Sequence, residues 1–502
     1  MDSKNSLLYK NFHKHPAALV ESASGIYLHT SDGRKILDAT SGAAVACLGY
    51  DNKEVQKAVV DQLVSVPYCH PGFYKTKSAE DLADFLVDST HGHMSKAVLC
   101  GSGMISDTTS YHHDQHRITG SEAVEVALKL AKTHFSHLAI PQTERCHFIA
   151  RVGAWHGATL GALTLGDFKV RKDPFVQLIS QNSSRVSACS TYRGLQKGET
   201  EEAYVQRLAQ ELDDEFQRVG PNKVCAFVAE TVGGSASGCA MPVKGYFPAM
   251  KAVCEKYGAL LILDEVMCGM GRTGSLHAFE QEDVVPDILV VGKGLGAGYA
   301  PISAVMLNTK LVESFQKSGK GFAHGQTYMA HPQAAAAGLK VQQVIRDTNM
   351  VAHVQRMGDY LGSRLKERLL PLPWVGDIRG RGLFWAVEFV IDKKSKEPFP
   401  YSLGLHGMLH SKGMSEGYEI SLFNANGGYD GYSGDHFLIC PPFIVNEADV
   451  DEIVDRTARV IEDTFSELVN SAVWEKIAIQ MDIAAETPVA DIAVGETLVS
   501  VK

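Results

Sequence analysis

The sequence predicts an α/β fold organised around a largely parallel β-sheet. Two observations support this prediction. Between about residues 95 and 310, short apolar runs alternate with stretches of helical periodicity. The apolar runs lack the polar alternation of strands that face water on one side, so we expect strands that are buried on both faces.

The expected elements follow one another in a consistent order along the chain. The strands of the main sheet are predicted at residues 97–100, 147–150, 225–229, 260–263 and 288–291. Before them we expect a strand pair at residues 25–29 and 34–38 and a helix over 55–64. After them we expect one long helix from about residue 335, a strand-rich segment (382–390 and 436–440) and an amphipathic helix over 448–468.

Composition excludes several classes of function. The 502 residues suffice for two domains with large cores, and the net charge of −10 argues against nucleic acid or an anionic membrane as a partner. No apolar run reaches the length of a membrane span, and the N-terminus, with Asp2 and no apolar core, predicts neither a signal nor a transit peptide. The ten cysteines are scattered without a C-x-x-C pair. We therefore expect reduced thiols and a cytoplasmic protein.

Three polar residues stand at the ends of predicted strands. Glu230, Asp264 and Lys293 each follow an apolar run, and ligands of such sheets bind at the carboxyl ends of the strands. We therefore expect one shared cleft. Taken singly, Asp264 also fits a helix cap, Glu230 a cap or an ion pair, and Lys293 a surface turn.

The pairing of Lys293 with Asp264 indicates one particular chemistry. A lysine that forms a Schiff base and an acid that keeps a pyridine nitrogen protonated are the groups required by a pyridoxal phosphate (PLP) enzyme. The glycines after Lys293 do not form a dinucleotide fingerprint, because Tyr299 stands where the last glycine is needed.

Further motifs carry a resemblance to a known family. They are Gly120-Ser121-Glu122-Ala123, Trp155-His156-Gly157, Asp264-Glu265-Val266, Gly325-Gln326-Thr327-Tyr328, Arg379-Gly380-Arg381-Gly382 and Gly434-Asp435-His436. In this order they resemble a class III aminotransferase of the ω-aminotransferase group, over roughly residues 20 to 465. The resemblance implies PLP fold type I, with a mainly parallel seven-stranded sheet and a small α+β domain formed from both chain ends. It places the domains at residues 1–70, 71–335 and 336–470, with a tail at 471–502.

The resemblance also implies how the cofactor is held. Gly120 and Ser121 bind the phosphate at a helix N-terminus, where free N–H groups and the helix dipole favour anions. Trp155 stacks on the pyridine ring, and a core aromatic is the alternative for that residue. His156 and Val266 belong to the same cofactor-binding set.

The resemblance assigns the catalytic roles to two residues. Asp264 forms a charged hydrogen bond to the ring nitrogen. Lys293 forms the Schiff base and then carries a proton between substrate and cofactor.

Subunit and substrate contacts complete the implied site. Thr327 reaches the phosphate of the neighbouring subunit's cofactor, which implies a homodimer. Glu230 and Arg272 are the candidate substrate residues, Arg379 is a further candidate for a carboxylate, and each arginine also fits a structural role. No metal site is expected.

The implied function is the transfer of an amino group from a primary amine or ω-amino acid to a keto acid. A decarboxylating or mutase member of the same fold is an alternative, because these enzymes share the Schiff-base chemistry. Residues 104–120 interrupt the expected phosphate loop, and their removal would leave Gly-Ser-Gly-Ser-Glu-Ala in frame. We interpret this segment as a retained intron or as a true loop insertion. A weakly PLP-binding or inactive form is therefore a second alternative.

Overall fold

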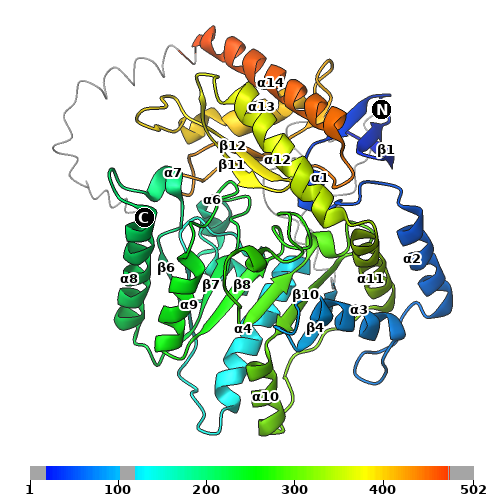
Figure 1. Ribbon diagram of the computed structural model, residues 1–502, viewed down its shortest axis with the longest axis vertical. Coiled ribbons are helices and arrows are strands. Elements are labelled where there is room, and N and C mark those ends of the chain that lie inside the picture. The colour runs from blue at the N-terminus through cyan, green and yellow to red at the C-terminus, as the bar shows by residue number, and fades with distance from the viewer. Residues whose placement is uncertain (1–17, 102–118, 473, 475–502) are drawn as a thin grey trace, which may run out of the picture.

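The computed structural model describes residues 18–101, 119–472 and 474. These residues form two lobes, one around a seven-stranded sheet and one around two smaller sheets (Figure 1). The predicted insertion at 104–120 lies outside the described residues, apart from Thr119 and Gly120, which belong to the first turn of a helix.

The seven-stranded sheet of the large lobe is parallel except for one strand. Its order is β4-β10-β9-β8-β7-β5-β6, and β10 runs antiparallel to both of its neighbours. The predicted mainly parallel sheet is therefore present. The strands are β4 (Lys96–Gly101), β5 (His147–Arg151), β6 (Ser183–Val186), β7 (Val224–Glu230), β8 (Leu260–Glu265), β9 (Ile288–Val291) and β10 (Ile302–Leu307).

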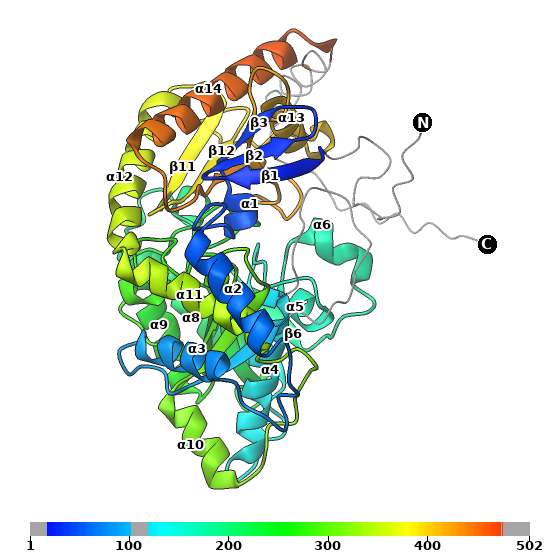
Figure 2. The same ribbon diagram turned by 90° about the vertical axis from the view of Figure 1, so that its right-hand side faces the viewer.

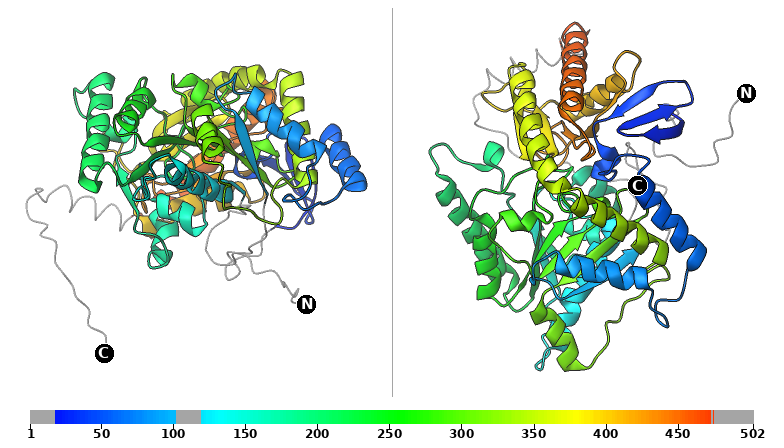
Figure 3. Two further views of the ribbon diagram at one scale, coloured as in Figure 1. Left: turned by 90° about the horizontal axis from the view of Figure 1, so that it is seen from below. Right: turned by 45° about the vertical axis from the view of Figure 1, so that its right-hand side comes forward.

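Both faces of this sheet are covered by helices, which explains the unbroken apolar runs (Figure 3). Alternate residues of each strand enter different cores. Phe227 and Leu261 pack with α3, α8 and α9, whereas Ala226 and Leu260 pack with α4 and α10. The helices of this lobe are α3 (Lys77–Asp88), α4 (Thr119–His137), α5 (Leu160–Leu165), α6 (Lys169–Lys172), α7 (Thr191–Gly194), α8 (Glu201–Val219), α9 (Tyr246–Lys256), α10 (Thr309–Ser318) and α11 (Pro332–Asp347), with 3-10 turns η1 (Asp173–Phe175), η2 (Ala278–Gln281) and η3 (Lys293–Leu295).

The small lobe is built from segments far apart in the chain. The N-terminal strands share a sheet with β13 through the parallel pair Leu37 and Ile420, and Figure 2 shows these strands in the same lobe as α13 and α14. The two sheets are β1-β2-β3-β13 and β11-β12-β15-β14. Their strands are β1 (Val20–Ser24), β2 (Tyr27–Thr30), β3 (Lys35–Asp38), β11 (Val375–Arg381), β12 (Phe384–Phe389), β13 (Ile420–Ser421), β14 (Phe423–Ala425) and β15 (His436–Ile439), and the remaining helices are α1 (Ser41–Ala44), α2 (Lys53–Ser65), α12 (Met350–Leu369), α13 (Leu405–Gly413), α14 (Glu447–Val469) and η4 (Tyr401–Leu403).

The prediction of one long helix after residue 335 was wrong. The chain forms α11 and α12 instead, separated at Asn349, whose φ of 51° lies in the left-handed region. Asparagine adopts this conformation more readily than most residues, so it allows the chain to turn between the two helices. None of the described helices combines the length and apolar character needed to cross a membrane.

Candidate active site

Three neighbouring parallel strands end at one edge of the large sheet. Glu230, the last residue of β7, pairs with Asp264 of β8, and Asp264 pairs with Val290 of β9. Lys293 follows β9 at the start of η3. Because the three strands are parallel and in register, their polar ends meet at the same edge.

A cavity at this edge contains eight of the ten predicted site residues. The other two, Thr327 and Arg272, are not part of its described lining. The lining is Gly120, Ser121, Trp155, His156, Gly157, Ala158, Glu230, Val232, Ser235, Asp264, Val266, Met267, Cys268 and Lys293.

Asp264 and His156 form a buried pair inside the cavity. The His156 Nδ1 lies 2.8 Å from Asp264 Oδ2, and the Val266 N–H donates to Asp264 Oδ1 over 3.0 Å. The His156 side chain is fully buried, and its Nε2 atom has no hydrogen-bond partner among the described residues. These contacts fix the orientation of the carboxylate, and each of its oxygens retains a lone pair for a further donor.

The start of α4 forms another wall. Ser121 Oγ accepts a 3.0 Å hydrogen bond from the Ala158 N–H. A Cβ atom at Gly157 would lie 2.4 Å from that Oγ, and one at Gly120 would lie 2.6 Å from a methyl group of Val266. Glycine is therefore required at both positions for the helix start, the Trp155-His156-Gly157 turn and the end of β8 to approach one another.

Trp155 lies at the border between this cavity and α6. Its ring packs edge-on against Phe168 at 6.0 Å, and the Arg171 guanidinium carbon lies 4.8 Å from its centroid. Its backbone N–H donates to Glu230 Oε2 over 3.3 Å. The indole is thus held from two sides while it contributes to the cavity wall.

Lys293 has a backbone conformation that is unusual for its residue type. Its φ is +43°, in the left-handed region where residues other than glycine are uncommon. Such conformations persist where the surrounding structure enforces them, and they concentrate at functional sites. The buried neighbours Gly294 and Leu295 anchor the turn that places Lys293 at the cavity.

Glu230 is a buried carboxylate that faces the cavity. Its Oε1 accepts from the Gly234 N–H over 2.8 Å, and its Oε2 accepts from the Trp155 N–H over 3.3 Å. Burial raises its pKa above the usual range of a glutamate, against the opposing effect of the nearby His156.

Arg272 lies between the lobes, where it holds backbone groups. Its guanidinium donates to the carbonyls of Leu383 (3.0 Å) and Pro441 (2.6 Å) and lies 4.5 Å from the Phe443 ring centroid. The side chain is almost fully buried. These contacts describe a structural role, which is the alternative that the sequence left open for this arginine.

Arg379 and Thr327 also lie outside the described lining. Arg379 donates to Asp377 (2.8 Å), Glu388 (2.6 Å) and the Ser237 carbonyl (2.9 Å). Its guanidinium group therefore binds two carboxylates of the small lobe and one backbone carbonyl of the large lobe. Thr327 is exposed.

Six residues of the cavity lining were not predicted as site residues, and two of them, Gly157 and Ala158, directly follow the predicted His156. Val232 and Ser235 follow β7, and Met267 and Cys268 follow β8. The signal that leads to them is their place just after strand ends that already carried Glu230 and Asp264.

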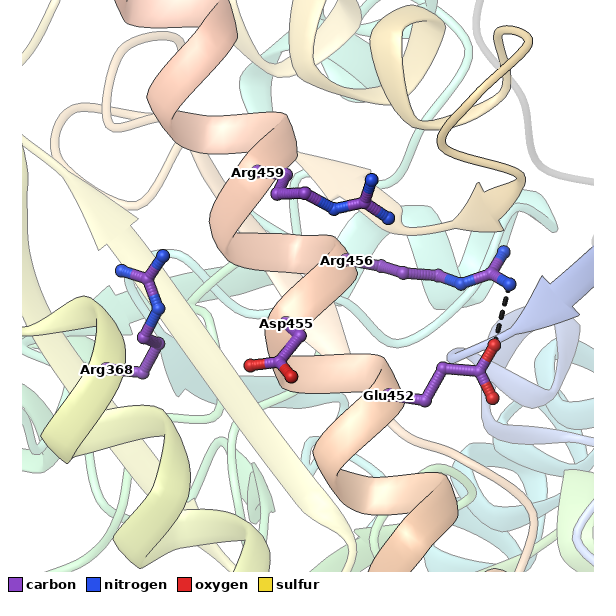
Figure 4. A pocket seen from close by; sticks show the side chains of 5 residues that line it. All are labelled: Arg368, Glu452, Asp455, Arg456 and Arg459. Atoms are coloured by element: carbon purple, nitrogen blue, oxygen red, sulfur yellow. Dashed lines mark ion pairs between the residues drawn. The ribbon is translucent and has the colours of Figure 1, made fainter.

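A second hollow lies on the surface between α12 and α14, and Figure 4 shows its five lining residues, Arg368, Glu452, Asp455, Arg456 and Arg459. Arg456 pairs with Glu452 at 2.6 Å, and Arg368 pairs with Glu462 at 2.7 Å. These two arginines of the hollow are therefore paired with glutamates, and the pairs are partly exposed to water.

The chemistry of the cavity fits PLP. A helix start with close-approaching glycines suits a phosphate, Asp264 suits a protonated ring nitrogen, Trp155 offers a ring face, and Lys293 offers an amine. No group of three or more described His, Cys, Asp or Glu residues has the arrangement of a metal site.

Comparison with known proteins assigns the family. The model of the aminotransferase class-III family matches residues 8–461. An aminotransferase of Gibberella zeae is 45% identical to the chain over 90% of this chain and 85% of its own length. An uncharacterised aminotransferase of Schizosaccharomyces pombe is 43% identical over 93% and 97%. The chain therefore belongs to the class III aminotransferases, whose fold is PLP-dependent.

Solved structures confirm the fold. The ω-transaminase of Pseudomonas jessenii in complex with PMP superimposes with a TM-score of 0.80, at 30% identity, over 89% of this chain and 93% of its own. The predicted PLP fold type I, the family and the aminotransferase class of enzyme are confirmed.

Proposed function

We propose that the chain transfers an amino group from a primary amine or an ω-amino acid to a keto acid, using PLP bound covalently at Lys293. The observation that supports this most strongly is the shared cavity of Lys293, Asp264 and the start of α4. The family supports transamination in general, and the particular residues are our assignment.

Each wall of the cavity would hold a different part of the cofactor. Gly120 and Ser121 would bind the phosphate, Trp155 would stack on the ring, and Asp264 would accept a hydrogen bond from the ring nitrogen. When bound, PLP supplies an electron sink that stabilises negative charge on the carbon next to the substrate amine. His156 keeps Asp264 oriented through the 2.8 Å contact.

Lys293 would have two tasks. Its Nζ atom forms the covalent link to the cofactor, and once released it moves a proton from the substrate carbon that bears the amine. The η3 turn places Lys293 just after β9, and the neighbouring strand β8 carries Asp264.

The described cavity favours a donor whose remote end carries no carboxylate. Lys293 is its one cationic side chain among the described lining residues, and Glu230 adds a buried acid beside the apolar Val232 and Met267. A remote carboxylate would be repelled by Glu230. For the carboxylate of an ω-amino acid donor, Arg171 is a candidate partner, because its guanidinium carbon lies 4.8 Å from the centroid of the Trp155 ring in the cavity wall.

A homodimer is proposed on the basis of an exposed apolar surface beside Thr327. Val64, Phe73 and Tyr74 are 80%, 77% and 66% exposed, and the Tyr68 ring lies 6.0 Å from that of Tyr328. Large apolar side chains exposed close to one another are typical of protein–protein interfaces. Light scattering should give twice the chain mass, and Phe73→Glu should lower it to that of one chain. A wild-type chain that is monomeric at micromolar concentration would contradict the dimer.

Product analysis tests the proposed reaction. Purified protein is incubated with PLP, a primary amine and pyruvate or 2-oxoglutarate, and we expect a carbonyl product and an amino acid in equal amounts. Carbon dioxide or an isomerised amine without transfer would instead indicate the decarboxylating or mutase alternative. If only a chain lacking residues 104–120 reacts, the full chain is the inactive alternative. A cytoplasmic location stays a prediction, tested by fractionation.

A further inference from the structure

The segment after β7 forms a cavity wall without secondary structure of its own. It connects Glu230 to α9 and contributes Val232 and Ser235 to the lining. Within residues 231–240 its backbone has two internal hydrogen bonds among those described, from the Gly233 N–H to the Ala240 carbonyl at 2.9 Å and from the Cys239 N–H to the Gly234 carbonyl at 3.4 Å. The position of this wall therefore depends on what holds it from outside.

His436, the first residue of β15 in the small lobe, reaches this segment. Its Nε2 lies 2.8 Å from the Ser235 carbonyl oxygen, and its Nδ1 lies 2.9 Å from the Gly434 carbonyl oxygen. The ring is fully buried. One ring thus spans two carbonyl groups that belong to different lobes.

Arg379 holds the same segment at a second point. Its Nη2 donates to the Ser237 carbonyl over 2.9 Å, and its other contacts are to Asp377 and Glu388. A Cβ atom at Gly238, whose φ is +58°, would lie 2.7 Å from Arg379 Nη2 and 2.9 Å from His436 Cδ2. The segment packs directly on these two side chains.

The two carbonyls compete for one donor when the ring is neutral. Burial and the Arg379 charge lower the pKa of His436, while Glu388 and the two carbonyls oppose this. The other nearby charges balance, because Arg193 pairs with Glu388 and Arg379 with Asp377. A neutral imidazole donates from a single nitrogen, so one carbonyl receives the N–H and the other faces a lone pair.

We propose that His436 is a positioning residue whose Nε2–H holds the Ser235 carbonyl and thereby sets the substrate-facing wall of the cavity. The proposal rests on the proposed function, because the wall matters for an amine donor bound near Lys293. His436 acts through Ser235 and touches neither the predicted phosphate site nor Asp264 in any described contact.

Two matched variants separate the nitrogens. The amide nitrogen of His436→Gln occupies the region of Nε2, whereas that of His436→Asn occupies the region of Nδ1. We expect His436→Asn to raise the KM for an amine donor about five- to tenfold, as for one lost hydrogen bond, with kcat and PLP affinity within about twofold. We expect His436→Gln to retain the wild-type KM.

Hydrogen exchange gives a readout that needs no turnover. Backbone amides of residues 233–240 should exchange faster in His436→Asn than in the wild type and at the wild-type rate in His436→Gln. If His436→Asn is poorly folded by circular dichroism, Gly238→Ala provides a second test, because its methyl group pushes the segment away from His436 and should raise both KM and exchange.

The outcomes distinguish the two proposals. Equal KM and equal exchange in the Gln and Asn variants, or a Gly238→Ala variant that matches the wild type in both, would overturn the role of His436. A wild-type protein that consumes no amine would overturn the proposed function, and the exchange comparison would still decide whether His436 holds the segment.

Discussion

Two of the hollows formed by the described residues are lined by ionisable side chains, and they differ in how far water is removed from their charges. In the cavity at the sheet edge, the side chains of His156 and Asp264 are 0% and 6% exposed. In the hollow between α12 and α14, those of Arg456 and Glu452 are 22% and 36% exposed (Figure 4). Exposed ion pairs contribute little to stability, whereas buried ionisable groups interact strongly with one another and have shifted pKa values. The reactive hollow is therefore distinguished by the burial of its ionisable side chains and not by their number.

The largest expected effect comes from removing the amine of the cavity. Lys293→Ala should lower transamination by more than about 100-fold, because both covalent binding and proton transfer are lost. Lys293→Arg keeps the charge but forms no Schiff base, so it should be equally inactive. Amine consumption under saturating PLP measures both, and an active arginine variant would show that the charge alone suffices.

Replacing the acid that faces the predicted ring nitrogen should have the next largest effect. Asp264→Asn removes the negative charge while keeping the size of the side chain, and we expect kcat/KM to fall about 10- to 100-fold. The affinity for PLP, measured by fluorescence titration, should fall as well. Unchanged kinetics and affinity would place the ring nitrogen elsewhere.

The buried acid beside Asp264 should make stability depend on pH. Glu265 accepts hydrogen bonds from Thr231, Ala278 and Phe279, yet burial raises its pKa from 4.5 to about 7. Between these values the folded state keeps a proton that the unfolded state has lost, so the Glu265 contribution to the free energy of unfolding falls as pH rises. The shift corresponds to about 3 kcal/mol.

Denaturant unfolding of Glu265→Gln and the wild type at pH 4.5 and pH 7 tests this prediction. The wild-type advantage over Glu265→Gln should be larger at pH 4.5 than at pH 7. An advantage that grows with pH would mean that Glu265 is ionised in the folded protein throughout this range.

Loss of the residue that orients Asp264 should have a smaller effect. His156→Phe removes the 2.8 Å contact and preserves most of the packing volume, so we expect kcat/KM to fall about fivefold to tenfold. In the Asp264→Asn background the same change should cost less, because the two residues act as one unit. Additive losses would show that His156 acts independently of Asp264.

The smallest effect is expected in the charged hollow. Arg459 lines this hollow, and its contacts are long: 3.5 Å from its Nη1 to the Gly417 carbonyl oxygen and 5.9 Å from its guanidinium carbon to the Tyr418 ring centroid. Arg459→Ala should change stability by less than about 0.5 kcal/mol and leave kcat/KM unchanged. A large loss of activity would contradict the distinction between the two hollows, because it would show that the exposed hollow takes part in function.

The sequence predicted the strand-end residues because strand order and apolar runs are local signals. Glu230, Asp264 and Lys293 each stand beside such a run, and a parallel sheet places such ends at one edge. Arg272 shows where this reasoning ends, since its partners Leu383 and Pro441 lie 111 and 169 residues further along the chain. Long-range packing, rather than local pattern, decides where an arginine points.

The cavity wall after β7 was missed for a related reason. Ser235 lies in an irregular segment with no hydrophobic period, so no sequence template applies to it. Its position depends on His436, which is 201 residues away in the chain and belongs to the other lobe. The division of the chain into domains at residues 70 and 335 likewise stays a prediction.

The measurement that tests the central claim most directly is reductive trapping on the full-length chain. PLP is added to purified protein, the product is reduced with borohydride, and the labelled peptide is mapped. We predict a single pyridoxyl label on Lys293, and its absence from Lys293→Arg. A label on another lysine, or none with fully folded protein, would contradict the assignment of this cavity as the PLP site.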